Sequence, residues 1–318
     1  MRSAVIFLVF NRPELTARVL DRIRAAQPPR LLVVADGPRP DHPEDAAKVA
    51  AVRSQIDTGI DWPCEVLRDE AEENLGCGRR VSSGLDWAFG HIEEAIILED
   101  DCLPHPSFFS FCDEMLARYR DDARVMHVAG TNLAASRMKS GTKAWFSRHA
   151  WVWGWATWRR AWQHYDFTMD SWTERLPTLR ASFASSWERR YWLPTLDRAR
   201  RELARANTWD YSWHYTCRSL GGRAIVPTRN LIENLGFGVD HTHTPLALRR
   251  LQQPGEDCGP ITDSVSSRIS PYHDELISRV YMGEPPTLIN DLKSRIRTAP
   301  ATVAQIFGDL LRVTPLSR

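Results

Sequence analysis

Three consecutive carboxylates, Glu99-Asp100-Asp101, follow the apolar run from Ala95 to Leu98. Such a run is typical of a buried strand, which would deliver the acids to the edge of a sheet. Adjacent carboxylates repel one another, and partial burial makes their ionised forms costly unless a cation is near. Carboxylate oxygens suit Mg²⁺ or Mn²⁺, with substrate phosphates completing the shell. The triplet is therefore a candidate site for a metal and a diphosphate, and the alternative is a loop whose acids face water.

A fourth acid follows another apolar run, because Leu31 to Ala35 is typical of a strand and ends at Asp36-Gly37. Ligands in open α/β sheets collect at the carboxyl ends of the strands, so Asp36 and the triplet are expected to share one crevice. An Asp-Gly pair is also typical of a turn, which leaves a structural role open. The segment from Asn74 to Arg80, with two glycines and two arginines, is a weaker candidate for contacting a diphosphate.

Strand and helix signals alternate through the first half of the chain. Strands are expected at 5–10, 31–35, 64–67 and 95–98, and helices at 13–27, 43–56 and 81–92. This alternation predicts an α/β fold whose helices flank a mostly parallel sheet.

Composition narrows the class of protein. The 318 residues, 43% of them hydrophobic, can bury a large core in one domain or in two fused halves. Lys and Arg number 41 and Asp and Glu 40, without a long basic tract, so nucleic acid is not an expected partner. The sequence contains no run of about eighteen apolar residues, so no membrane-spanning helix is predicted. The start of the chain is interpreted as a strand and not a signal peptide, and six cysteines without a CxxC pair suggest reduced thiols in the cytoplasm.

Six motifs follow one another in the chain: Ile97-Leu98-Glu99-Asp100-Asp101, Pro106-Ser107-Phe108-Phe109, Val125 to Asn132, Trp151 to Trp162, Trp209 to Trp213, and Ile225 to Asn230. In this order and spacing, over residues 4 to 245, they resemble GT-A-fold glycosyltransferases, both bacterial family-2-like enzymes and animal N-acetylglucosaminyltransferase I. The resemblance implies a GT-A, Rossmann-like fold with a nucleotide-sugar-binding half at 1–130, an acceptor-binding and catalytic half at 131–245, and a C-terminal lid or helical extension at 246–318.

The activity implied is a metal-dependent, inverting transfer of a hexosyl or N-acetylhexosaminyl group from a UDP-sugar to a glycan or lipid-linked acceptor, as in bacterial polysaccharide biosynthesis. Asp101 would then bind Mn²⁺ or Mg²⁺ directly, Asp100 would contact the ribose or metal-bound water, and Glu99 would orient the nucleotide-sugar. Asp36 would hydrogen-bond the base, expected to be uracil.

Further residues take roles from the same resemblance. The base pocket would be walled by Phe10, Asn11 and Arg12. Arg79 or Arg80 would contact the diphosphate or the base, and the alternative is a surface arginine pair. His241 and His243 are candidates for an additional metal ligand. We expect at most one of the two to reach the metal, and the alternative is a polar loop.

Asp210 is the predicted general base, since an inverting transferase needs one carboxylate to take the proton of the acceptor hydroxyl. Asp166 and Asp170 are rivals, although a Tyr-Asp pair is also typical of a cap or turn. Trp153-Gly154-Trp155 is the predicted sugar-contacting group, with flat indoles as platforms and a glycine that lets backbone approach. The alternation of Trp151, Trp153 and Trp155 predicts a strand with all three on one face, and core packing is the competing explanation.

The chain beyond residue 245 carries less information. Residues 254–271 are interpreted as a connector or lid, and two short amphipathic helices are expected beyond Leu292. We expect them to pack on the core, with homodimerisation or peripheral binding to an anionic membrane surface as alternatives.

Two other functions remain open from the sequence. A nucleotidyltransferase that makes sugar nucleotides should carry a glycine-rich loop with Lys or Arg after the first strand, where this chain has Asn11-Arg12-Pro13-Glu14. A non-catalytic sugar-binding scaffold would keep the tryptophans without needing Asp101 or Asp210.

Overall fold

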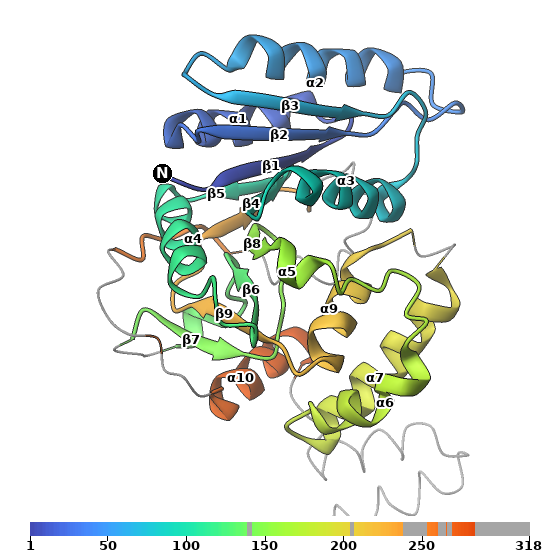
Figure 1. The fold of residues 1–318 in the computed structure, drawn as a ribbon, viewed down its shortest axis with the longest axis vertical. Helices are drawn as coiled ribbons and strands as arrows, with labels where there is room; N and C mark the ends of the chain where they lie inside the picture. Colours follow the sequence, from blue (N-terminus) through green and yellow to red (C-terminus); the bar gives the residue numbers. More distant parts are fainter. Residues whose placement is uncertain (139–141, 204–206, 238–252, 260–264, 266–268, 284–318) are drawn as a thin grey trace, which may run out of the picture. The chain divides into compact units, whose positions relative to one another are not determined.

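The computed structural model describes residues 1–138, 142–203, 207–237, 253–259, 265 and 269–283. These residues form an eight-stranded sheet in the order β3-β2-β1-β4-β8-β6-β9-β7 (Figure 1). The strands are β1 (Ala4–Val9), β2 (Arg30–Ala35), β3 (Glu65–Glu70), β4 (Glu94–Glu99), β6 (Val125–Ala129), β7 (Ala144–Ser147), β8 (Trp155–Trp158) and β9 (Arg223–Pro227). Only β8 and β7 run against the other described strands of this sheet. The predicted α/β class, a Rossmann-like and mostly parallel sheet with flanking helices, is confirmed.

Strand register decides where the acids lie. Within the parallel first half, Val9 of β1 pairs with Ala35 of β2, and Leu8 pairs with Glu99 of β4. The three strands therefore end side by side, so that Asp36 and the triplet emerge at the same edge of the sheet. The apolar runs are explained by burial on both faces, as in parallel sheets with helices on each side.

Helices cover both faces of this sheet (Figure 1). They are α1 (Pro13–Ala26), α2 (Asp45–Gly59), α3 (Cys77–His91), α4 (Pro106–Arg118), α5 (Arg159–Trp162), α6 (Trp172–Ala181), α7 (Ser186–Arg201), α9 (Asp210–Ser219) and α10 (Pro271–Met282), with a 3₁₀ turn η1 at Ala135–Arg137. Phe7 of β1 packs in one core cluster with α1, α2 and α4, whereas its neighbour Ile6 packs in a second cluster with α3 and α9. This division follows from the period of two in a strand.

A second, two-stranded antiparallel sheet was not anticipated. It pairs β5 (Cys102–Pro104), directly after the triplet, with β10 (Ile232–Asn234). The pairing places the residues that follow β10 next to Asp101. The backbone N–H of Leu235 donates to the Asp101 carbonyl at 2.7 Å. A Cβ atom on Gly236 would lie 2.3 Å from Oδ2 of Asp101, so only glycine fits there without displacing the carboxylate.

The predicted three-tryptophan strand is wrong. Strand β8 begins at Trp155, and Gly154 before it has a φ of +58°, which breaks the alternation. The three indoles consequently go to different places. Trp151 contacts Tyr281, Trp153 contacts Phe237, and Trp155 lies in the core beside Trp209 and Trp213.

The described residues up to Tyr281 belong to one compact unit. Helix α10 belongs to it, since Ile277 packs with Trp145 and Val226, and the Asp274 carboxylate accepts hydrogen bonds from Ser147 and from the Arg148 amide. The amphipathic helices expected beyond Leu292 lie outside the described residues. No helix in the described part of the chain is both long and apolar enough to cross a membrane.

A buried ionic cluster joins the helices of the second half. Arg218 of α9 is 1% exposed and donates from Nη2 to Oε1 of Glu188 on α7 at 2.6 Å. His149 and Ser278 of α10 complete the cluster, with Ser278 Oγ 3.1 Å from His149 Nε2. Because a buried charge needs a partner, this cluster fixes how α7, α9 and α10 pack together.

Candidate functional site

The acidic triplet holds a cation that the chain itself supplies. Arg12, between β1 and α1, donates from Nη1 to Asp100 Oδ1 at 3.2 Å and to Asp101 Oδ2 at 2.9 Å. The backbone amide of Phe10 also donates to Asp100, at 3.4 Å. The end of β1 thus supplies the donors and the end of β4 the acceptors, as the parallel pairing of these strands requires.

Electrostatics in the triplet follow from burial and mutual repulsion. Burial raises the pKa of Glu99 well above its usual value, and the charges of Asp101 and Asp100 raise it further. Burial likewise raises the pKa of Asp100 to about 6, although Arg12 acts in the opposite direction. Negative charge on Glu99 and Asp100 is therefore unfavourable, and a nearby cation relieves it.

Asp36 is buried at the same edge and accepts four hydrogen bonds. Its Oδ1 receives the amides of Gly37 (2.9 Å) and Leu75 (2.8 Å), and its Oδ2 receives the Gly76 amide (3.1 Å) and Asn74 Nδ2 (3.0 Å). A carboxylate has about four acceptor positions, so these donors occupy them. In the structure Asp36 fixes the loop before α3, and its predicted contact with a base is untested.

The loop that Asp36 fixes meets the segment carrying Asp210. Asn207 Oδ1 accepts the Gly78 amide at 3.1 Å, and a Cβ atom on Gly76 would lie 2.7 Å from the same oxygen. Gly76 has a φ of +78°, which also favours glycine. Sequence reasoning missed Asn207, whose one signal was its position just before Trp209-Asp210.

Asp210 is the first residue of α9, where the helix dipole favours a negative charge. Thr208 Oγ1 donates a hydrogen bond to Asp210 Oδ1. Burial raises the pKa values of Glu99 and Cys77, and the charge of Asp210 raises both further. The pKa of Cys77 is also raised by Asp101 and lowered by Arg12. Asp210 therefore lies in the electrostatic neighbourhood of the triplet, although it follows it by more than a hundred residues.

The rival acids have other surroundings. Asp166 accepts hydrogen bonds from the amides of Asp170 and Ser171, each at 3.0 Å, and so closes the turn before α6. Burial raises the pKa of Tyr215, and the charge of Asp166 raises it further. Asp170 is exposed in the same turn.

The expected base pocket contains two residues that the sequence did not single out. Asn11 Nδ2 donates to Asp45 Oδ1 at 2.7 Å, and Arg39 pairs with the same carboxylate at 2.6 Å. Arg39 lowers the pKa of Asp45 to about 2. The Arg39 guanidinium lies 5.5 Å from the centre of the Phe10 ring. Phe10 and Asn11 thus form one small cluster with Arg39 and Asp45, while Arg12 turns to the triplet.

The two candidate arginines on α3 differ sharply. Arg80 is 6% exposed and pairs with the Asp69 side chain and carbonyl, so it holds α3 against the end of β3. A diphosphate contact by Arg80 would break this buried pair, which argues against that role. Arg79 is exposed and remains the candidate of the two.

The three residues of the predicted sugar-contacting group, Trp153, Gly154 and Trp155, have different surroundings. Trp155 is 0% exposed and packs in the core, so it offers no face to a ligand in this structure. Gly154 is buried, and a Cβ there would lie 2.3 Å from Ile232, so the glycine serves packing. Trp153 is partly exposed and keeps the predicted role as a candidate. Three tyrosines near Asp210 were missed: Tyr165, Tyr211 and Tyr281. Burial raises the pKa of each and the charge of Asp210 raises it further, that of Tyr211 to about 12.

The contacts that Asp100 and Asp101 make with Arg12 indicate whether these acids could bind a metal ion. Asp100 and Asp101 direct one oxygen each to the same cationic nitrogen, which fits a hard cation held by one or two carboxylates. Within the described residues no group of three or more His, Cys, Asp or Glu could hold a metal ion, so further ligands would have to come from elsewhere. His241 and His243 lie outside the described residues.

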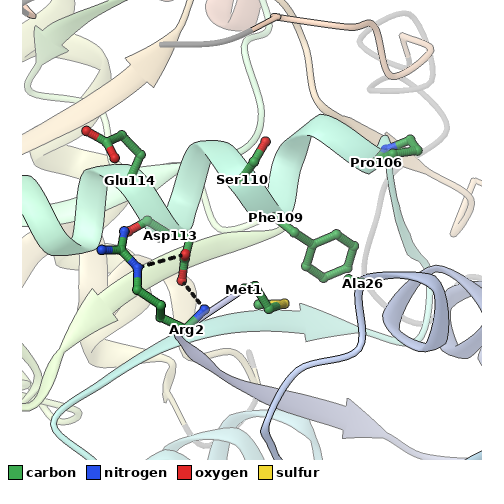
Figure 2. Close-up of a pocket in the computed structure, with 8 residues that line it drawn as sticks. All are labelled: Met1, Arg2, Ala26, Pro106, Phe109, Ser110, Asp113 and Glu114. Carbon is green, nitrogen blue, oxygen red and sulfur yellow. Dashed lines mark hydrogen bonds and ion pairs between the residues drawn. The ribbon is translucent and has the colours of Figure 1, made fainter. Parts of the chain in front are cut away.

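A pocket of about 290 Å³ lies away from this site. It is lined by Met1, Arg2, Ala26, Pro106, Phe109, Ser110, Asp113 and Glu114 (Figure 2). Asp113 accepts hydrogen bonds there from the Arg2 amide and Arg2 Nε, and so anchors the start of β1 on α4. Because the acids follow the ends of the strands, this pocket belongs to the opposite edge of the sheet.

Comparisons with known proteins give only distant likenesses. No protein-family model matches the chain, and no curated protein matches it. One similar solved structure is the mannosyltransferase PcManGT from Pyrobaculum calidifontis in complex with GDP-Man and Mn²⁺, 15% identical, covering 98% of this chain and 81% of that chain with a TM-score of 0.45. S. aureus TarS 1–349 is 10% identical, covering 74% and 61% with a TM-score of 0.40. An apo UDP-glucose pyrophosphorylase is 9% identical, covering 74% and 93% with a TM-score of 0.38. Likenesses this distant carry no argument about function.

Proposed function

We propose that this chain is a metal-dependent, inverting glycosyltransferase that moves a sugar from a nucleoside diphosphate sugar, with UDP as the expected carrier, to a glycan or lipid-linked acceptor. One observation carries the proposal. Asp210 starts α9 three residues after Asn207, whose side chain accepts the Gly78 amide beside the loop that Asp36 holds at the edge where the triplet emerges. Sugar transfer needs acids in two roles, one to bind a cation beside the diphosphate and one to take a proton.

The residues divide between these roles by their surroundings. Asp101, assisted by Asp100, would hold Mn²⁺ or Mg²⁺, which when bound neutralises charge on the diphosphate. Asp210 would accept the proton of the attacking hydroxyl, since the dipole of α9 favours its ionised form and Thr208 orients it. Phe10, with Arg39 over its ring, would form one wall of the base pocket.

Calorimetric titration of UDP, and separately of GDP, with and without Mn²⁺ tests the donor site. We expect binding that requires metal and is lost in Asp101→Asn. Asp61→Asn, in an exposed pair at the far end of α1, is the matched control and should bind normally. If neither nucleotide binds under any condition, the transferase proposal fails.

Turnover of nucleotide-sugars tests the base. Asp210→Asn should retain nucleotide affinity and lose about 10²- to 10⁴-fold in transfer rate. Unchanged transfer in this variant would require another base. Release of pyrophosphate from UTP and a sugar 1-phosphate would instead support a nucleotidyltransferase, and nucleotide-independent sugar binding would support a scaffold. The residues after β1, Asn11-Arg12-Pro13, lack the glycine-rich loop that a nucleotidyltransferase would be expected to carry.

A further inference from the structure

Arg12 contacts both of the acids that would hold a divalent cation. Its Nη1 donates to one oxygen of Asp100 and one of Asp101 at once, at 3.2 and 2.9 Å. These side chains are largely shielded from water, with 21% of Arg12, 8% of Asp100 and 15% of Asp101 exposed. An ion pair with so little solvent around it is screened much less than a surface pair.

The guanidinium and a metal ion would compete for the same oxygens. A guanidinium stays protonated in proteins, so Arg12 cannot leave the triplet by losing its charge. Burial alone would lower the pKa of Arg12, but Asp100 and Asp101 outweigh this effect and raise it. A cation that enters must therefore displace the side chain, which then needs another anionic partner.

We propose that Arg12 is a built-in counter-ion of Asp100 and Asp101, which competes with the divalent cation and turns to the diphosphate when metal and nucleotide bind together. The alternative partner would be a diphosphate bound near the start of α1. Arg12 caps α1, and its carbonyl accepts the Thr16 amide at 2.9 Å, so its side chain starts at a helix N-terminus that favours anions. Arginine also matches phosphate oxygens in geometry and charge.

This exchange links metal affinity to nucleotide affinity. Without nucleotide, the cation must separate a shielded ion pair, so metal binding is weak. With nucleotide, the displaced guanidinium gains the diphosphate and the carboxylates gain the metal, so all charges stay paired. The diphosphate step rests on the proposed function, whereas the competition for Asp100 and Asp101 does not.

The test measures Mn²⁺ binding alone and UDP binding in the presence of Mn²⁺ for the full chain and for Arg12→Gln. We expect opposite changes: Mn²⁺ alone binds about tenfold more tightly, because a repelling positive charge has gone, and UDP with Mn²⁺ binds about tenfold more weakly. Arg12→Lys keeps the charge and should leave affinity for Mn²⁺ alone near the original. Arg24→Gln, which removes an exposed arginine from the other end of α1, should change neither. Circular dichroism and melting temperature establish that the variants fold.

The possible results separate the two proposals. Tighter Mn²⁺ binding and weaker UDP binding in Arg12→Gln support the counter-ion. Unchanged or weaker Mn²⁺ binding in Arg12→Gln overturns it, as does absence of Mn²⁺ binding in both proteins, even if the original chain binds UDP. Tighter Mn²⁺ binding without any nucleotide binding in the original chain supports the competition, but overturns both the diphosphate step and the proposed function.

Discussion

The Asn207 side chain accepts the backbone N–H of Gly78 at 3.1 Å and joins segments 129 residues apart. Gly78 lies in the first turn of α3 beside the loop that Asp36 holds, and Asn207 lies three residues before Asp210. The edge of the first half of the sheet is therefore connected to the proposed base by one side chain. Asn207 also has a φ of +42°, a conformation that asparagine tolerates better than most residues.

We predict that Asn207→Ala lowers the transfer rate constant about tenfold while the affinity for nucleotide with Mn²⁺ changes less than twofold. The change removes the acceptor that fixes Asp210 relative to α3 but leaves the triplet intact. Steady-state kinetics and calorimetry on one preparation separate the two effects. Asn207→Asp, which retains an acceptor oxygen, is the matched control and should recover part of the rate. Equal losses of affinity and rate would contradict a positioning role.

Gly236→Ala should weaken binding of nucleotide with Mn²⁺ by tenfold or more. The added methyl would lie 2.3 Å from Asp101 Oδ2, so the carboxylate must move from the position in which it meets a cation. Calorimetry of UDP with Mn²⁺ measures the effect, with Gly90→Ala as control because a Cβ there meets nothing within 4 Å. Normal affinity in Gly236→Ala would show that the placement of Asp101 does not matter for binding.

Arg218→Met should destabilise the fold by about 3–5 kcal/mol, because it leaves Glu188 buried without a cation. Urea unfolding followed by tryptophan fluorescence provides the measurement. Arg279→Met, which removes one partner of a surface pair with Glu275 on α10, should cost less than about 0.5 kcal/mol. The double variant Arg218→Met with Glu188→Leu should recover stability relative to Arg218→Met. A loss for Arg218→Met as small as that for Arg279→Met would refute the structural role of the cluster.

The buried histidines make stability depend on pH. Burial lowers the pKa of His127 to about 3, and its ring is satisfied as the neutral form, with Nε2 donating to the Trp151 carbonyl and Nδ1 accepting from Trp213 Nε1. Unfolded histidine titrates near 6.5, so this contribution to stability is complete above that pH and declines as the pH falls from 6.5 toward 3.

We therefore predict that the destabilisation caused by His127→Gln is about 2 kcal/mol smaller at pH 5.0 than at pH 7.5. Comparing the variant with the original chain at each pH cancels the contributions of the raised carboxylates, such as Asp100, which act in the opposite direction. Urea titrations at both values measure the difference. His42→Gln, at an exposed position, should show no such change. A cost for His127→Gln that is independent of pH would contradict this prediction.

The positions of the Trp153 and Trp155 indoles could not be predicted from the local sequence pattern. Their alternation with Trp151 predicted one strand face, but the positive φ of Gly154 ends the pattern before β8 begins. Glycine is required at this position because Ile232 of β10, 78 residues later in the chain, lies where a Cβ would stand. A contact so distant in sequence leaves no periodic signal.

The sequence by itself determined the elements whose causes are local. Continuous apolar runs specified β1, β2 and β4, and the acids after them, Asp36 and the triplet, could be placed at one edge because parallel strands end together. The tertiary structure alone decided which partners those acids have. Arg12 reaches Asp100 and Asp101, Gly236 lies against Asp101, and Asn207 holds Gly78 only after packing has brought separate segments together. Side-chain pairing depends on positions in space, whereas residue type and spacing encode only the local conformation that precedes it.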